Sequence, residues 1–104
     1  MKRGSAMRFR IQQRVACKLL DLSEEEFRQI ARMDPAAETQ RSYDVIRIAR
    51  ALAILLPHPR RPAEWMRAEN SGPIFKNQSA LELIETEVGA LEAVRRYLEA
   101  ELYR

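Results

Sequence analysis

A chain of 104 residues with 46% apolar and 32% charged residues has the size and composition of one small folded domain. Its single cysteine, Cys17, cannot form an internal disulfide, and its longest apolar run, residues 51–56, is far shorter than the ~20 residues that span a membrane. The basic segment 1–10 is not followed by the apolar stretch of a signal peptide. We therefore expect a cytoplasmic protein without membrane contact.

Charge is distributed unevenly. Residues 1–67 carry 14 basic and 8 acidic groups, a balance of +6, whereas residues 68–104 carry 4 basic and 7 acidic groups, a balance of −3; together they give the net charge of +3. An arginine-rich surface suits phosphate contacts, and it equally suits ion pairs between helices. Charge alone therefore leaves nucleic-acid binding by the first half open.

The N-terminal part is predicted to form two helices. The first has an apolar face made of Ile11, Val15, Leu19 and Leu22, which recur at helical spacing. A capping box of Ser23 and Glu26 begins the second, which should end before Pro35. Its inward side chains are expected to be Phe27, Ile30 and Ala31.

A linker, residues 34–39, leads to a longer third helix. Its predicted inward stripe consists of Tyr43, Ile46, Ala49 or Arg50, Ala53 and Leu56. Because the end of this helix is almost entirely apolar, we expect it to be the buried central helix. The proline-rich segment 57–62 ends it.

The C-terminal part is predicted to form shorter helices. Pro62 suits the first turn of a helix that carries Trp65, and a tight turn follows at residues 70–73. A second capping box, Ser79 with Glu82, begins another helix. Gly89 interrupts it, and the last helix has an apolar face formed by Leu91, Val94, Leu98 and Leu102. The sequence therefore predicts an all-α compact bundle of five or six helices.

No residues form a recognisable catalytic or metal-binding set. His58 lies between two prolines without a carboxylate or nucleophile placed beside it, and Cys17 is more simply explained as a packing residue in a helix. One histidine and one cysteine do not supply a metal site, and the three glycines form no phosphate-binding loop. We therefore expect no catalytic, cofactor-binding or metal-binding residues, no cofactor and no enzyme activity.

The aromatic residues of the C-terminal part admit different interpretations. Trp65 is expected to be an anchor of the core. The last helix continues its apolar and aromatic face to residues 102–104, with no segment after it to cover them. These terminal residues must pack on their own core or on a partner, and both interpretations stay open.

The order of signals from Trp65 to Leu98 resembles the toxin-binding domain shared by Xre/MbcA/ParS antitoxins. That family has a Trp-Leu-like pair, an Asn before a turn, a G-x-S/T-P/A-L-x-L-like helix start, a Gly, and V-x-x-x-L in the last helix. This chain departs in having Asn77-Gln78 where a turn with glycine is usual. The matching positions, expected to form the scaffold, are Trp65, Asn70, Ser79, Leu81, Leu83, Gly89, Val94 and Leu98.

The resemblance implies an antitoxin of a type II toxin–antitoxin system. Such a protein binds and neutralises a partner toxin, usually a RES-domain toxin that consumes NAD, by obstructing its active site. It also implies a homodimer or a hetero-oligomer with the toxin. By position in the family, the toxin contacts would be Tyr97, Glu101, Leu102, Tyr103 and Arg104.

The resemblance further implies two regions that pack as one compact unit: a helical region of residues 1–56 and a toxin-binding domain of residues 57–104. Residues 20–27 look like the start of a helix-turn-helix, but little room is left for a recognition helix, so this unit is degenerate or compressed. The candidate DNA contacts are Thr39, Gln40, Arg41 and Ser42. The alternative function is a small DNA-binding transcriptional regulator acting through its basic N-terminal half, and a third is a helical dimerisation protein without a toxin partner.

Overall fold

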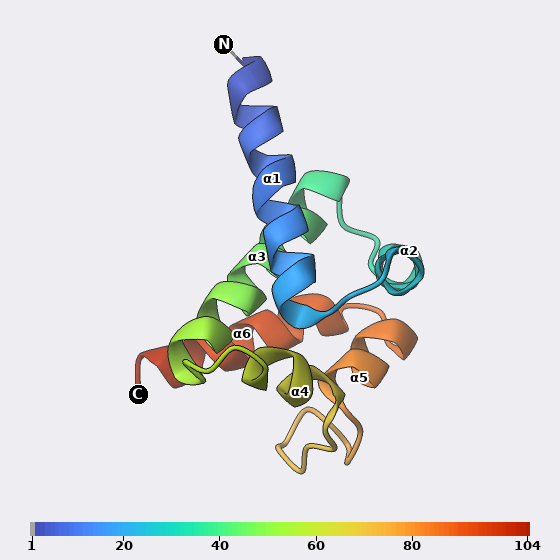
Figure 1. Ribbon diagram of the computed structural model, residues 1–104. Coiled ribbons are helices and arrows are strands. Elements are labelled where there is room, and N and C mark those ends of the chain that lie inside the picture. The colour runs from blue at the N-terminus through green and yellow to red at the C-terminus, as the bar shows by residue number, and fades with distance from the viewer. Residues whose placement is uncertain (1) are drawn as a thin grey trace.

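The computed structural model describes the backbone of residues 2–104 and the side chains of residues 8–104. Its elements are α1 (Lys2–Leu20), α2 (Glu24–Met33), α3 (Glu38–Leu55), α4 (Arg61–Arg67), α5 (Ala80–Thr86) and α6 (Ala90–Leu102) (Figure 1). Over residues 2–104 no strand forms, and extended pairing is limited to one antiparallel bridge between Glu69 and Ser79. The predicted all-α bundle is confirmed. No helix within residues 2–104 is long and apolar enough to cross a membrane.

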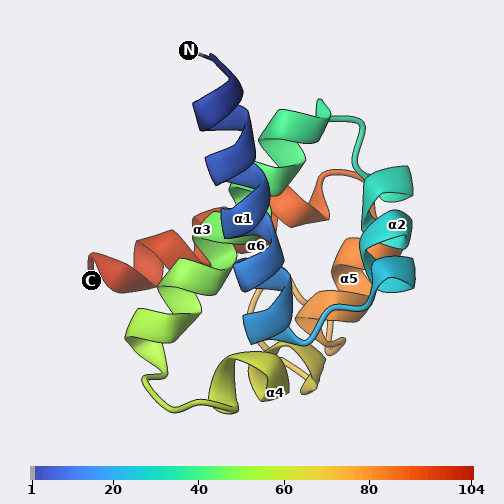
Figure 2. The ribbon, with the colours of Figure 1, turned by 45° about the horizontal axis from the view of Figure 1, so that its top comes forward.

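Helix α3 is the centre of the molecule, as expected, and it contacts α1, α4 and α6 (Figure 2). The predicted single inward stripe is wrong in part, because Tyr43 and Ala53 are exposed. Helices α1 and α6 cover different sides of α3, so its buried residues occupy more than one face. The buried residues are Ser42, Asp44, Val45, Ile46, Ile48, Ala49, Ala51 and Leu52. The linker is also shorter than expected, since α3 begins at Glu38.

Helix α1 packs on α3 through a different face from the one its sequence pattern indicated. Ala16 and Leu20 are buried, whereas Ile11 is 55% and Val15 62% exposed. The spacing of apolar residues correctly predicts the helix. It does not identify the side that meets the core, because α1 has apolar residues on two adjoining faces. One of those faces is left uncovered by this chain.

Both predicted capping boxes are confirmed. Ser23 accepts a hydrogen bond from the backbone N–H of Glu26, whose side chain in turn accepts from the N–H of Ser23, and Ser79 and Glu82 repeat the arrangement. Such reciprocal bonds satisfy backbone donors that the first turn of a helix leaves unpaired. Gly89 precedes α6 with a φ of 82°, in the left-handed region that glycine adopts without strain.

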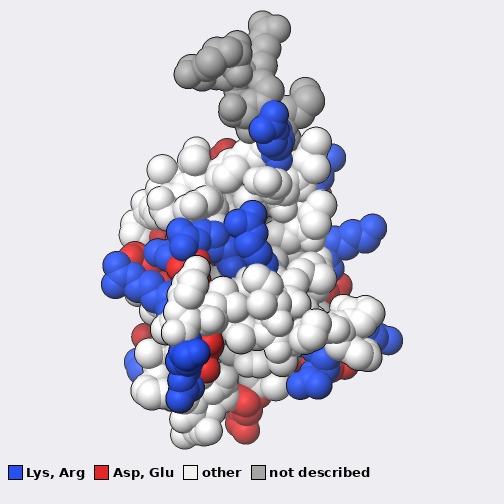
Figure 3. All heavy atoms as spheres, turned by 90° about the vertical axis from the view of Figure 1, so that its left-hand side faces the viewer, with Lys and Arg blue, Asp and Glu red and all other residues white. Residues whose placement is uncertain are grey.

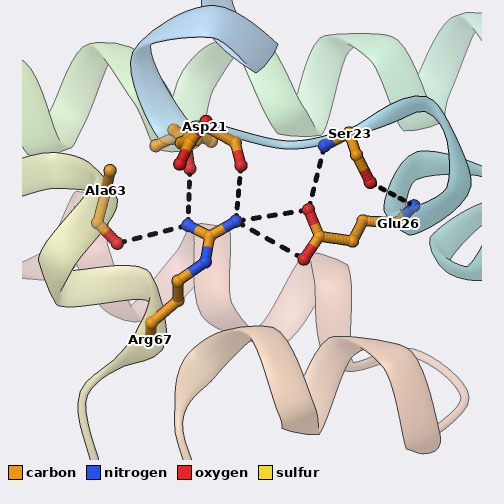
Figure 4. A network of polar contacts seen from close by, with 6 residues as sticks. Asp21, Ser23, Glu26, Ala63 and Arg67 are labelled. Atoms are coloured by element: carbon orange, nitrogen blue, oxygen red, sulfur yellow. Dashed lines mark hydrogen bonds and ion pairs between the residues drawn. The ribbon is translucent and has the colours of Figure 1, made fainter.

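Arg67, at the end of α4, connects the N-terminal helices to the C-terminal part (Figure 4). Its guanidinium donates hydrogen bonds to the backbone carbonyl oxygens of Leu20, at 2.9 Å, and Asp21. It also lies 3.2 Å from the carboxylate of Glu26, the same group that caps α2. A cation at the carboxyl end of α1 satisfies carbonyls that have no partner within the helix. One side chain of α4 therefore secures both the end of α1 and the start of α2.

Candidate functional site

The aromatic core of the C-terminal part is centred on Phe75, in the connection between α4 and α5. Phe75 is fully buried. The rings of Trp65 and Tyr97 both pack edge to face on it, with centroid distances of 5.7 Å for Trp65 and 5.0 Å for Tyr97. Such geometry adds to the stabilisation from burial alone. Trp65 is itself only half-buried, so it is a flank of this cluster. Sequence reasoning missed Phe75, although an apolar pair, Ile74-Phe75, inside a turn-rich segment is a signal that could have indicated it.

The connection that holds Phe75 is fixed by local hydrogen bonds. The side-chain oxygen of Asn70 accepts from the backbone N–H of Gly72 at 2.8 Å. The backbone N–H of Gln78 donates to the carbonyl of Phe75 at 2.8 Å, with Lys76 and Asn77 between them at φ values of 54° and 62°. Two central residues with positive φ are typical of a type I′ turn, and asparagine tolerates that conformation. The turn therefore forms without a glycine.

A partly buried chain of charges joins α6 to α3. The Nε of Arg95 lies 2.6 Å from Oδ1 of Asp44, and its Nη1 lies 2.8 Å from Oε1 of Glu99, which also pairs with Arg47. Burial raises the pKa of Asp44, although the positive charge of Arg95 opposes the shift. Burial alone would lower the pKa of Arg95, but Asp44 and Glu99 outweigh it, so the pKa of Arg95 is raised. Alternating charges on facing helices fix the position of α6, and hence of its end.

The end of α6 and the adjoining side of α3 form one surface, which we term the tail face. It surrounds an open hollow of about 230 Å³. Tyr103 is 85% exposed, Ile54 is also exposed, and the guanidinium of Arg47 lies 5.1 Å from the ring centroid of Tyr43, within reach of a cation–π interaction. Figure 3 shows the side of the molecule on which α6 ends, where Lys and Arg side chains, several with Asp or Glu beside them, are surrounded by uncharged surface. The residues of the tail face are Tyr43, Arg47, Arg50, Ala51, Ile54, Glu99, Leu102 and Tyr103.

The structure divides the predicted toxin contacts between two places. Leu102 is half-buried against the core and lines the tail face with Tyr103. Arg104 is exposed and pairs with Glu101 at 3.1 Å. Tyr97 lies apart from them: it packs on Phe75 and lines a separate hollow of about 510 Å³ beside Ile74, Gly89 and Arg96. The contribution of α3 to the tail face was not predicted, because nothing in the sequence shows which part of α3 adjoins the end of α6.

The four candidate DNA contacts form the first turn of α3 and no helix of their own. Thr39 and Gln40 are exposed. Arg41 donates a hydrogen bond to the carbonyl of Ala36, and Ser42 is buried and donates to the side chain of Gln13. Gln40, although exposed, also donates from its Nε2 to Oδ1 of Asp44 at 3.2 Å. Three of the four side chains are therefore engaged within the protein.

Comparison with known proteins bears on the C-terminal half. Residues 51–104 match the family model described as the antitoxin Xre/MbcA/ParS C-terminal toxin-binding domain. Comparison with curated proteins finds no match. Comparison with solved structures likewise finds none. The matched segment begins within α3 and includes the aromatic cluster and the whole of α6. It also includes the entire lining of the hollow beside Tyr97 and part of the lining of the tail face. With half of its length in that match, the chain belongs to the family of antitoxins that carry the Xre/MbcA/ParS toxin-binding domain.

Proposed function

We propose that this protein is the antitoxin of a type II toxin–antitoxin system and neutralises a RES-type, NAD-consuming toxin by direct binding. The tail face is the proposed contact surface, and Tyr103 with its neighbours obstructs the active site of the toxin. The observation that carries the proposal is the exposure of Tyr103 at the end of a helix that belongs to the matched domain. The protein acts by occupying a surface, so it needs no cofactor and no catalytic group of its own.

The composition of the tail face supports this role. Tyrosine and arginine are over-represented among the residues that dominate the free energy of protein–protein association. A tyrosine also offers a large contact area with few rotatable bonds, so ordering it on binding costs little conformational entropy. Leu102 is anchored on the core, which presents Tyr103 from a fixed point. A preformed surface of this kind loses less free energy on binding than a disordered tail would.

The two regions are proposed to act as one unit, with residues 57–104 as the toxin-binding domain and residues 1–56 as its helical support. Contacts across that boundary support this division of roles. Arg67 bonds the end of α1, and Asp44 in α3 pairs with Arg95 in α6. Because α3 also supplies Arg47 and Ile54 to the tail face, the N-terminal region contributes to the proposed contact surface.

The proposal is tested by purifying the chain together with the product of the neighbouring gene and measuring NAD consumption. We expect a stable complex with suppressed NAD consumption. Tyr103→Ala should weaken inhibition by at least about tenfold, because an aromatic anchor at the centre of an interface commonly contributes that much. Val88→Ala is the matched control, since Val88 is an exposed apolar residue just before the start of α6, away from the tail face. Absence of a complex, or a toxin that stays active in excess antitoxin, contradicts the proposal.

Operator binding receives less support than toxin binding. A recognition helix must enter the major groove, whereas α3 packs against both α1 and α6 and its first turn bonds inward. A regulator would require a sequence-specific operator, not only salt-sensitive binding to any duplex. Electrophoretic mobility measurements on the promoter DNA, with a random duplex as competitor, separate these two cases.

A further inference from the structure

The uncovered side of α1 forms an apolar groove with α3, outside the aromatic cluster and the tail. It is an open hollow of about 250 Å³. Its floor contains Ala16, Ile46 and Ala49, which are buried, and its walls carry the exposed side chains of Ile11 and Val15. The complete lining is Ile11, Gln12, Val15, Ala16, Leu19, Ile46, Ala49, Arg50 and Ala53.

Exposed apolar side chains in a groove differ from the single apolar residues found on most surfaces. Ile11 and Val15 are four residues apart, one turn of helix, so they form a continuous ridge, and Leu19 extends it. Exposure of the apolar side chains of Ile11 and Val15 to water is unfavourable. Contiguous exposed apolar patches commonly mark interaction sites. The groove therefore has the form of a docking site for an apolar stripe.

The charges around the groove indicate which charged groups a ligand would carry beside its apolar stripe. The described charged side chains of α1 are all basic: Arg8, Arg10, Arg14 and Lys18. Arg8 and Lys18 continue the ridge of Ile11 and Val15 at helical spacing, and Arg50 lines the groove from α3. Within the described residues none of these cations forms an ion pair, in contrast to Arg47, Arg67 and Arg95, which all do. A ligand with carboxylates around the border of an apolar stripe would complement this arrangement.

A second copy of the chain does not have that pattern. Two α1 helices facing each other would oppose basic residues with basic residues. Among the described residues, the remaining large exposed apolar side chains are Tyr43, Ile54, Val88 and Tyr103. Tyr43 and Ile54 share a side of α3 with the basic residues Arg47 and Arg50, and Val88 and Tyr103 lie outside the helices, so none of them offers an acidic helix face for the groove. Nucleic acid would satisfy the cations but leave Ile11 and Val15 without apolar partners, because phosphates carry no apolar stripe.

We propose that the groove between α1 and α3 binds an amphipathic helix of a partner protein, with acidic residues flanking its apolar face. Apolar residues spaced three and four apart would insert between Val15 and Ala53. Glutamates near the two ends of the apolar stripe would meet Arg8 and Lys18, and those on its α3 side would meet Arg50. This is the helix-in-groove mode of recognition. It does not depend on the proposed toxin contacts, because its determinants lie outside the tail face except for Arg50.

The test uses the full chain and two synthetic helical peptides. Both carry leucines at positions one, five, eight and twelve; one has glutamates on the flanks and the other has lysines. Methyl NMR spectra report on Ile11 and Val15 directly. We expect the glutamate peptide to shift these signals and the lysine peptide to leave them unchanged. Val15→Asp should weaken binding by about tenfold or more, and Arg50→Glu should weaken it and make it less sensitive to salt.

Controls keep the outcome interpretable. Val15 is exposed, so Val15→Asp should unfold at the same temperature as the wild type, and Val88→Asp places the same change at an exposed position outside the groove. Val88→Asp should bind the glutamate peptide normally. The proposal is overturned if neither peptide binds, if both bind equally, or if a random DNA duplex shifts the same methyl signals more strongly. Concentration-dependent shifts without any peptide would instead assign the groove to self-association and would equally overturn it.

Discussion

The two halves of the chain differ in how completely their apolar side chains are buried. In the C-terminal half, short helices and tight turns enclose Phe75 between Trp65 and Tyr97. Among residues 57–104, the large apolar side chains that stay exposed are Val88 and Tyr103. In the N-terminal half, the long helix α1 leaves Ile11 and Val15 open to solvent. Helix length does not indicate how completely a segment is buried. The short elements are the better enclosed because caps and turns fix them against one another.

The comparison predicts that the centre of the aromatic cluster is the most sensitive position in the chain. Phe75→Ala should lower the free energy of unfolding by about 3–5 kcal/mol, because it removes a fully buried ring and leaves a cavity between two others. Urea denaturation followed by Trp65 fluorescence measures this change. Ile11→Ala, which also truncates an apolar residue but at an exposed site, should cost less than about 1 kcal/mol. Equal losses in the two variants would contradict the contrast between the halves.

The join between the halves should have the next largest effect. Arg67→Ala removes the donors to the carbonyls of Leu20 and Asp21 and the partner of Glu26. We expect a loss of about 1–2 kcal/mol, since hydrogen bonds from a charged group are strong but this side chain is partly exposed to solvent. Arg61→Ala in the same helix, whose pair with Glu64 is long at 3.9 Å and exposed, should change stability by less than about 0.5 kcal/mol. Thermal unfolding of both variants beside the wild type measures the two losses of stability.

The charged residues between α3 and α6 should make the free energy of unfolding depend on pH. Burial raises the pKa of Asp44 in the folded state, so on acidification the folded protein protonates Asp44 at a higher pH than the unfolded chain does. Its contribution to stability is therefore fully present below the ordinary carboxyl pKa, about 4, and is lost as the pH rises through the raised value. Asp44→Asn abolishes this dependence.

The measurement is the difference in unfolding free energy between the wild type and Asp44→Asn, taken from urea denaturation at several pH values. That difference should shift in favour of the wild type on acidification from pH 7. Glu85, whose pKa is also raised by burial and by the neighbouring Glu26, is present in both proteins, so its effect cancels. A difference that is constant with pH would show that Asp44 titrates alike in both states.

The smallest effect on stability is expected at the tail. Tyr103→Ala should change the free energy of unfolding by less than about 0.5 kcal/mol, because the ring is largely in solvent. Leu102→Ala should cost more, since Leu102 packs against the core. A calorimetric melting curve of each variant checks the order. Tyr103→Ala is therefore a sharper probe of toxin binding than deletion of residues 102–104, which would also remove core packing.

Local signals in the sequence predicted local structure well. Both capping boxes, the end of α2 before Pro35, and the turn at Asn70 depend on residues only a few positions apart, and they form as expected. The helical stripes were less informative, because periodicity identifies a helix but a second neighbour can bury another face. For this reason the stripe predicts Tyr43 and Ala53 to face inward, whereas both are exposed.

The candidate site was predictable only in part, for the same reason. Leu102 and Tyr103 could be singled out as terminal apolar residues of the last helix. Their neighbours Arg47 and Ile54 are distant in sequence and meet them because α6 packs on α3, in a contact that includes the pair of Asp44 and Arg95. Phe75 was overlooked because a residue in a connecting segment carries no periodicity, although it is the most enclosed ring in the chain.

The single carboxylate of Glu26 makes two contacts, and through them it couples helices that are far apart in the sequence. It caps the start of α2 and receives Arg67 from α4, so opening of α4 away from the body also weakens the first turn of α2. Amide hydrogen exchange at Ser23 and Glu26 should therefore follow the exchange of the α4 amides, as parts of one cooperative unit. Replacing Arg67 should accelerate exchange at both places and leave the exchange of the α5 capping turn, which uses Glu82 in the same way without an arginine, unchanged.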